Sequence, residues 1–271
     1  MEYIEFNNGE QFPKLGLGTY KLKGKEGQAA VETALALGYR QLDTAQMYDN
    51  EKEVGAAIIN SRVDSADVFV TTKIWPTNFT RLVEATEESL RNLKIEQIDL
   101  LLLHWPAADI NDTKKGLELL NTVLHKGYAR FVGVSNFNIE LINTALEMSP
   151  IVCNQVEYHA LLNQQTLLEH LRKHNLSLTA YYPLAHTKLL DNVIIQIIAN
   201  IYNKTPSQIV LRWLVQQQGV AAIPKSANAR RQEHNLDIFD FTLSDADMTS
   251  ISNLGGNEHF INASTAPVWD I

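Results

Sequence analysis

The chain alternates short apolar runs with longer segments in which apolar residues recur at helical spacing. Runs without an exposed polar face are typical of parallel strands that helices cover on both sides. Nearly every run is followed by a predicted helix, which favours an α/β fold closed into a (β/α)₈ TIM barrel. The eight predicted strands are residues 15–19, 39–42, 68–72, 98–104, 130–134, 151–156, 176–181 and 219–223.

Helix start and stop signals agree with this alternation. Gly38 follows the first helical segment as a stop, and Asn50 or Asp49 precedes the second as a cap. The pair Thr205-Pro206 supplies a cap and a first-turn proline for a later helix. The expected helices cover residues 26–37, 51–59, 80–93, 114–126, 138–148, 164–174, 191–202 and 206–217, with a further helix from residue 229.

Residues 3–12 alternate apolar and polar side chains around Asn7-Asn8-Gly9. This pattern predicts an N-terminal β-hairpin that closes the bottom of the barrel. A length of 271 residues suits one barrel, and no linker or low-complexity segment interrupts it. We therefore expect a single domain over residues 1–271, ending in a tail, 254–271, without a strong pattern.

Net charge, the N-terminal sequence and cysteine content exclude several classes of protein. The net charge of −8 argues against nucleic acid as the main partner, although a local basic cluster can still bind a small anion. The N-terminus lacks signal-peptide character, and no run is long and apolar enough to cross a membrane. Cys153, the single cysteine, lies in an apolar run and is expected to be a buried small hydrophobe. We expect a cytoplasmic protein.

Four polar side chains follow three successive predicted strands. Asp43 and Tyr48 come after the strand at 39–42, and Lys73 and His104 come after the next two. Carboxyl ends of barrel strands form the ligand-binding face. A lysine ammonium beside a tyrosine lowers the phenol pKa from about 10, so the phenol can donate a proton near neutral pH. Each residue has an ordinary explanation alone, but together they favour an acid–base site.

Two further segments suggest a bound ligand. Residues 225–231 place Lys225, Ser226, Arg230 and Arg231 before or within the first turn of a helix, where backbone amides and cations favour a phosphate. A solvated basic helix start is the ordinary alternative. The run 15–19 carries glycines without the spacing of a Rossmann loop, which favours small residues that let a ligand approach the backbone.

At these residues the chain resembles the aldo-keto reductases. Six pieces occur in the family's order across nearly the whole chain, which makes the resemblance specific. They are Gly16-Leu17-Gly18-Thr19-Tyr20, Leu42-Asp43-Thr44-Ala45 with Tyr48, Thr71-Thr72-Lys73, Leu103-His104-Trp105-Pro106, Gly133-Val134-Ser135-Asn136-Phe137 and Ile223-Pro224-Lys225-Ser226.

The resemblance implies carbonyl reduction with a nicotinamide cofactor and no metal. Tyr48 would be the general acid, Lys73 would lower its pKa, Asp43 would pair with Lys73, and His104 would orient the carbonyl oxygen. NADP would be preferred over NAD, since the family binds the adenosine 2′-phosphate at residues 225–235. The implied cofactor contacts are Gly18, Thr19, Tyr20, Asp43, Ser135, Asn136, Gln155, Tyr181, Tyr182, Leu184, Ala185, Ile223, Lys225, Ser226, Asn228, Arg231, His234 and Asn235. His234 departs from the Glu or Gln that the family usually has near the adenine.

The substrate is expected to be a small polar carbonyl. Tyr20, Tyr48, Trp75, His104 and Trp105 would line its pocket, with Trp269 of the tail as a possible addition. The loop after His104 and the tail are both short for the family, which suggests an open pocket. The chain resembles in particular the small bacterial 2,5-diketo-D-gluconate reductases, especially the B form, which is also associated with methylglyoxal reduction. A monomer is expected.

Three alternatives stay open. Potassium-channel β subunits resemble the same family and act mainly as NADP-binding partners. A barrel aldolase would use Lys73 as a Schiff-base nucleophile, which would leave the basic segment 225–231 unexplained. A metal-dependent hydrolase is disfavoured, because no paired-histidine motif follows a strand.

Overall fold

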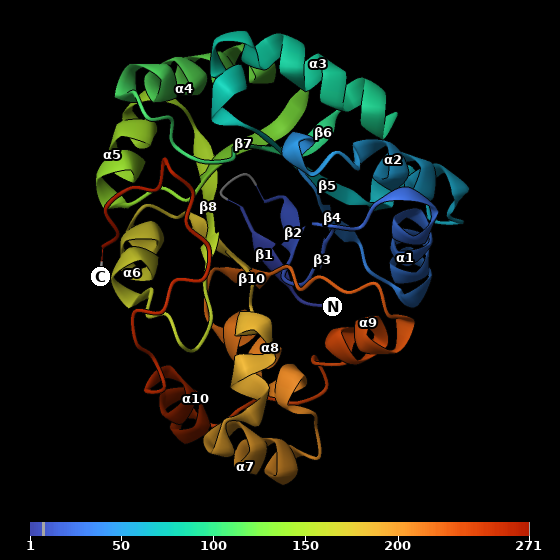
Figure 1. Cartoon of the computed structure of the whole chain (residues 1–271), viewed down its shortest axis with the longest axis vertical. Helices are drawn as coiled ribbons and strands as arrows, with labels where there is room; N and C mark the ends of the chain where they lie inside the picture. Colours follow the sequence, from blue (N-terminus) through green and yellow to red (C-terminus); the bar gives the residue numbers. More distant parts are fainter. Residues whose placement is uncertain (7–8, 271) are drawn as a thin grey trace.

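The chain forms a closed parallel barrel, seen here in a computed structural model that describes residues 1–6 and 9–270 (Figure 1). Each strand pairs in parallel with the next along the chain, which confirms the predicted fold class. The barrel strands are β3 (Leu17–Gly18), β4 (Gln41–Asp43), β5 (Phe69–Ile74), β6 (Ile98–Leu103), β7 (Ala129–Ser135), β8 (Ile151–Glu157), β9 (Ser177–Tyr181) and β10 (Val220–Ala222).

The first and last strands are joined by backbone hydrogen bonds that complete the barrel. Gly16 N–H donates to Ala222 O at 3.0 Å, and Ala222 N–H donates to Lys14 O at 2.8 Å. Beyond this seam, Gly18 N–H donates to Pro224 O at 3.2 Å. A Cβ atom on Gly18 would lie 2.7 Å from Ile223 O. Packing across the seam therefore requires this glycine, which is a different reason from the expected approach of a ligand.

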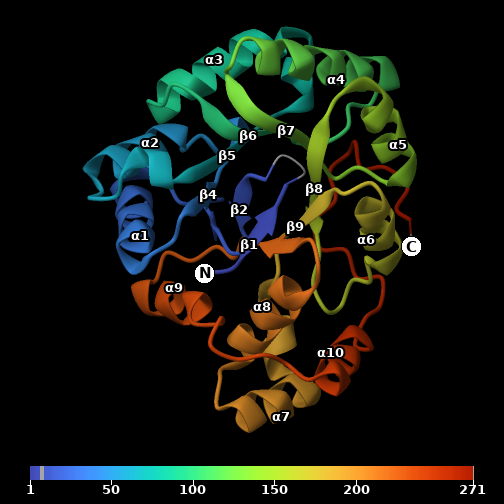
Figure 2. The ribbon, with the colours of Figure 1, turned by 180° about the vertical axis from the view of Figure 1, so that it is seen from behind.

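Helices surround the barrel, as both views show (Figures 1 and 2). Their apolar faces pack on the outward side chains of the strands in one large core. The helices are α1 (Gly24–Leu37), α2 (Glu51–Asn60), α3 (Leu82–Leu93), α4 (Ile110–His125), α5 (Ile139–Met148), α6 (Gln165–Lys173), α7 (Val193–Tyr202), α8 (Pro206–Gln216), α9 (Ala229–Leu236) and α10 (Asp245–Ser252).

Some helix boundaries agree with the local sequence signals, and others differ from them. Thr205 forms a capping box with Gln208 at the start of α8, as predicted. Helix α4 begins at Ile110 instead of residue 114, because the Asp109 side chain accepts from Asn111 N–H and caps it. Helix α10, capped by Ser244, was not predicted. At α2, Asn50 holds the cap position, but its side chain makes no capping bond.

The N-terminal hairpin closes the bottom of the barrel, as predicted. Strand β1 (Tyr3–Glu5) pairs antiparallel with β2 (Gln11–Pro13), while Asn7 and Asn8 of the expected turn lie outside the described residues. The ring of Phe12 contacts Phe69 of β5 at 5.0 Å between centroids, and Phe6 contacts Phe131 of β7 at 4.7 Å. Aromatic packing thus fills the end of the barrel opposite the carboxyl ends of the strands.

Two expectations from composition can be compared with the structure. Cys153 is fully buried inside the barrel, and burial raises the pKa of its thiol to about 12, as suits an inert side chain. Across residues 1–6 and 9–270, none of the helices combines the length and apolar character needed to span a bilayer.

Candidate active site

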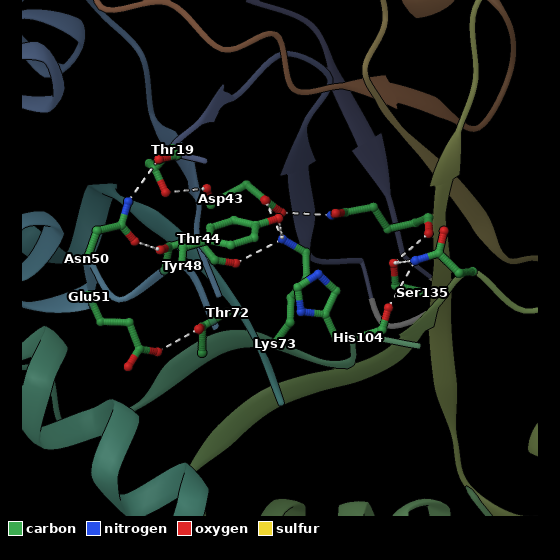
Figure 3. A network of polar contacts seen from close by, with 12 residues as sticks. Thr19, Asp43, Thr44, Tyr48, Asn50, Glu51, Thr72, Lys73, His104 and Ser135 are labelled. Carbon is green, nitrogen blue, oxygen red and sulfur yellow. Dashed lines mark hydrogen bonds and ion pairs between the residues drawn. The ribbon is translucent and has the colours of Figure 1, made fainter. Parts of the chain in front are cut away.

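The four predicted acid–base residues lie together at the carboxyl ends of β4, β5 and β6 (Figure 3). Asp43 ends β4, Lys73 is the penultimate residue of β5, and His104 follows β6 directly. Tyr48 reaches them from η1 (Gln46–Tyr48), a short 3₁₀ turn between β4 and α2. The structure therefore brings together residues that are up to 61 positions apart in the sequence, from 43 to 104.

A buried ion pair forms the centre of the site. The Lys73 ammonium lies 2.5 Å from Asp43 Oδ1 and also donates to Thr44 O at 2.8 Å. The other oxygen of Asp43 accepts from Gln155 Nε2 at 2.7 Å, across the barrel from β8. Both charged side chains are 1% exposed. Because each is fully hydrogen-bonded, the pair can stay ionised without water.

The environment keeps Lys73 positively charged. Burial acts to lower the pKa of its ammonium, but the adjacent Asp43 carboxylate and the Tyr48 phenol outweigh burial, so the pKa is raised. An ammonium group is not a nucleophile, which argues against the Schiff-base aldolase alternative. Within the described ranges, no three His, Cys, Asp or Glu side chains form a group that could hold a metal ion.

Tyr48 lies against this ion pair with its hydroxyl 3.5 Å from Lys73 Nζ. The expected decrease in the phenol pKa is wrong for this structure: burial raises it, and the opposing effect of the Lys73 charge is smaller. The phenol therefore holds its proton throughout the neutral range. Its ring is half-buried and lies 5.0 Å from that of Tyr20.

His104 completes the group as a neutral imidazole. Burial, and to a lesser degree the Lys73 charge, lower its pKa well below the usual value. Its ring lies 5.6 Å from that of Tyr48 and 5.1 Å from that of Trp75. Nδ1 is buried and has no hydrogen-bond partner among the described residues. A neutral ring beside the phenol can donate one N–H to a substrate oxygen without adding charge.

Asn50 fixes the loop that carries Tyr48, a role that the local sequence pattern does not indicate. Its Nδ2 donates to Thr19 O at 2.8 Å and to Leu22 O at 2.9 Å, and its Oδ1 accepts from Thr44 at 2.8 Å. This explains why the side chain does not cap α2. Just beyond it, Glu51 accepts from Thr72 at 2.7 Å and ties α2 to β5 (Figure 3).

Four of the expected cofactor residues, Ser135, Asn136, Gln155 and Tyr181, form one network beside His104. Asn136 Nδ2 donates to His104 O at 3.0 Å, and Asn136 Oδ1 accepts from Tyr181 OH at 2.7 Å. Ser135 Oγ donates to Gln155 O at 2.7 Å. Asn136 has a φ of 63°, a left-handed conformation that asparagine tolerates better than most residues. The network places a half-buried tyrosine ring at the end of β9 next to the acid–base group.

The expected phosphate segment lies at the start of α9, after β10. Asn228 caps this helix by accepting from Arg231 N–H at 3.0 Å, and Ser226 is 7% exposed. Lys225 and Arg231 are exposed, so their charges are available to an anion. The remaining expected cofactor residues are Gly18 at the end of β3 with Thr19 and Tyr20 after it, Tyr182, Leu184 and Ala185 after β9, Ile223 after β10, and His234 and Asn235 within α9.

The aromatic residues expected around a substrate differ in exposure. Tyr20 is 48% exposed and Trp75 is half-buried, so both face the mouth of the barrel. Trp105 is only 4% exposed, and Trp269 of the tail lies edge-on to it at 6.2 Å between ring centroids. Trp269 therefore lies next to the aromatic residues expected to line the substrate pocket, whereas Trp105 itself is buried.

The chain belongs to the aldo/keto reductase family, whose sequence profile matches residues 14–255. It is 40% identical over 263 residues to the glyoxal reductase of Bacillus subtilis, covering 94% of this chain and 93% of that protein. It is 36% identical over 267 residues to the methylglyoxal reductase DkgB of Yersinia pestis, covering 95% and 99%.

Solved structures agree with this membership. The crystal structure of a protein assigned as 2,5-diketo-D-gluconic acid reductase B superposes with a TM-score of 0.96 at 40% identity, covering 100% of this chain and 98% of that one. The aldose reductase of Schistosoma japonicum gives a TM-score of 0.92 at 33% identity, covering 100% and 99%. The family and the barrel are thereby established.

Proposed function

We propose that this protein is an NADPH-dependent reductase that converts the carbonyl group of small aldehydes and ketones to an alcohol, with Tyr48 as the general acid. One observation carries the proposal. A protonated phenol lies 3.5 Å from a buried lysine–aspartate pair and 5.6 Å, ring to ring, from a neutral imidazole. This arrangement offers a proton and a hydrogen-bond donor to one carbonyl oxygen.

The residues around the site fit a dinucleotide phosphate. A half-buried aromatic ring, Tyr181, lies next to the acid–base group, and amide side chains surround it. Exposed cations lie around the N-terminus of α9, a donor set suited to phosphate. When bound there, NADPH supplies the hydride that reduces the carbonyl carbon.

The protein's own residues would then have distinct roles. His104 orients the carbonyl oxygen, and Tyr48 transfers its proton to that oxygen as negative charge develops. The Lys73 ammonium stabilises the phenolate that remains, and Asp43 keeps Lys73 charged and in position. In the reverse direction, the phenolate would accept the proton of an alcohol.

The substrate class follows from the pocket and the relatives. Tyr20 and Trp75 offer aromatic surface beside Tyr48 and His104, which suits small polar carbonyls. The relatives named as reductases of glyoxal, methylglyoxal and 2,5-diketo-D-gluconic acid act on small dicarbonyls or keto-sugars. We infer the same class here, together with a cytoplasmic location and a monomeric state, which analytical ultracentrifugation would test.

The deciding experiment is NADPH oxidation at 340 nm with methylglyoxal, glyoxal and small keto-sugars, repeated with NADH. We expect turnover with a clear preference for NADPH. Tight NADPH binding without turnover on any carbonyl would instead favour a cofactor-sensing partner protein of the same fold.

Arg231 should determine the preference for NADPH. Arg231→Ala removes a charge-assisted contact to the 2′-phosphate, which is worth about 1.5–3 kcal/mol, and should raise KM for NADPH roughly 10- to 100-fold. KM for NADH should change little. The neighbouring exposed Arg230 is a matched control, so Arg230→Ala should have a smaller effect. Equal effects on both cofactors would reject a 2′-phosphate role for Arg231.

A further inference from the structure

The C-terminal strap, residues 256–270, runs from α10 across the end of β8 to the start of α5 (Figures 1 and 2). Its first part pairs with the loop after β8, where Asn163 N–H donates to Gly256 O at 3.0 Å. Its last part meets α5, where Ile139 N–H donates to Asp270 Oδ2 at 2.8 Å. Between these two ends, the barrel side chain of Glu157 is bonded to the strap, and Lys188 outside the barrel pairs with Glu258 at 2.6 Å.

Glu157 is a buried carboxylate that depends on the strap for its hydrogen bonds. It is 1% exposed, and it accepts from Phe260 N–H at 2.9 Å and from Ile261 N–H at 3.0 Å. His159 Nε2 lies 3.0 Å away and His259 Nδ1 lies 3.5 Å away. No lysine or arginine of the described chain forms an ion pair with it. Because a buried charge needs such donors, the carboxylate and the two backbone amides hold each other in place.

Strand β8 joins this anchor to the support of the acid–base group. Glu157 follows Gln155 by two positions on β8, so both side chains point to the same side of the strand. Gln155 is the residue that holds Asp43 at 2.7 Å. The end of β8 therefore supports the ion pair through Gln155 and the strap through Glu157.

At its other end, the strap covers the residue next to His104. The ring of His259, adjacent to the anchored Phe260, stacks on Trp269 with 4.6 Å between centroids and 15° between planes. Trp269 lies edge-on to Trp105, which immediately follows His104. The anchor at residues 260 and 261 therefore acts on Trp269 through His259, in addition to the bonds that join Val268 and Asp270 to the start of α5.

We propose that Glu157 is a positioning residue: it fixes the C-terminal strap through the amides of Phe260 and Ile261, so that Trp269 closes the substrate side of the site over Trp105. The kinetic part of this inference rests on the proposed function. The Glu157 side chain is bonded to the strap and to His159, not to the acid–base group or to α9, and only its backbone pairs with Tyr181 between β8 and β9. Loosening the strap should therefore raise KM for the carbonyl much more than it lowers kcat or weakens NADPH binding.

The test compares Glu157→Gln with Glu258→Gln. Glu258 lies on the strap and is exposed, so its variant removes one negative charge and an exposed ion pair with Lys188, which contributes little to stability, while the Glu157 anchor stays intact. In Glu157→Gln, hydrogen exchange of the strap amides and acrylamide quenching of tryptophan fluorescence should both increase. The exchange rate should rise by about tenfold, which corresponds to the loss of one charge-assisted hydrogen bond. KM for methylglyoxal should rise by about the same factor, with kcat and the NADPH Kd nearly unchanged. Glu258→Gln should behave like the parent protein.

A second variant keeps β8 intact. Ile261→Pro deletes one donor from the strap and should reproduce the loosening if Glu157→Gln fails to fold. Unchanged strap exchange in both variants, or equal loosening by Glu258→Gln, would overturn the assignment. Exchange and quenching need no turnover, so a parent protein inactive on every carbonyl would refute the proposed function while these measurements still decide the role of Glu157.

Discussion

Replacing Tyr48 with phenylalanine should lower kcat for carbonyl reduction by about 10²–10⁴-fold, the usual contribution of a positioned general acid. The phenyl ring keeps its contacts with Tyr20 and His104, while the proton donor 3.5 Å from Lys73 is lost. NADPH binding, followed by fluorescence titration, should stay within a few-fold of the parent. The measurement is single-turnover kinetics, which separates the chemical step from cofactor release.

Tyr20→Phe is the matched control for this change. Tyr20 presents a second phenol 5.0 Å away, ring to ring, but it is 48% exposed and makes no hydrogen bond to the ion pair. Its variant should keep most of the turnover. Full activity in Tyr48→Phe, or an equal loss in Tyr20→Phe, would remove Tyr48 from its proposed role.

Lys73→Met should destabilise the fold by about 3–5 kcal/mol, because it leaves a buried carboxylate without its cation. Asp43 would keep only the amide of Gln155 as a partner for a charge that is 1% exposed. Unfolding in urea, followed by circular dichroism, gives the free energy directly. Activity should also be lost, since no charge would remain to stabilise the Tyr48 phenolate.

A second substitution separates stability from catalysis. In Lys73→Met with Asp43→Leu, both charges are gone, and much of the lost stability should return. The double variant should still lack turnover. Restored stability with restored activity would show that the ion pair has no part in the chemistry.

Much of the barrel could be predicted from local patterns. Short apolar runs alternating with helical segments depend on nearest neighbours in the sequence, so they located all eight strands. The four acid–base residues could be found in the same way, because each follows a strand end. Boundaries were less certain where a single side chain decides them, as at Asp109, which starts α4 earlier than the periodicity indicated.

Other features depend on groups that are distant in the sequence. The bond from Gln155 to Asp43 spans 112 residues, and those from Glu157 to Phe260 and Ile261 span 103 and 104. The sign of the Tyr48 pKa shift is a balance between burial and one nearby charge, and only the folded structure gives the extent of burial. The period of two along β8 places Glu157 on the same side as Gln155, a signal that could have marked it for attention.

The seam between β3 and β10 has a consequence for how the protein acquires its site. Gly16 and Ala222 are joined there although 206 positions separate them, so their pairing has a high entropic cost during folding. Residues 18–20 and 223–226, both expected to contact the cofactor, flank this seam. A nascent chain that has emerged only as far as β9 therefore contains all four expected acid–base residues but only part of the expected cofactor site. We therefore expect that only the complete barrel binds the cofactor. Because NADPH would bind the folded state across the seam, it should raise the free energy of unfolding.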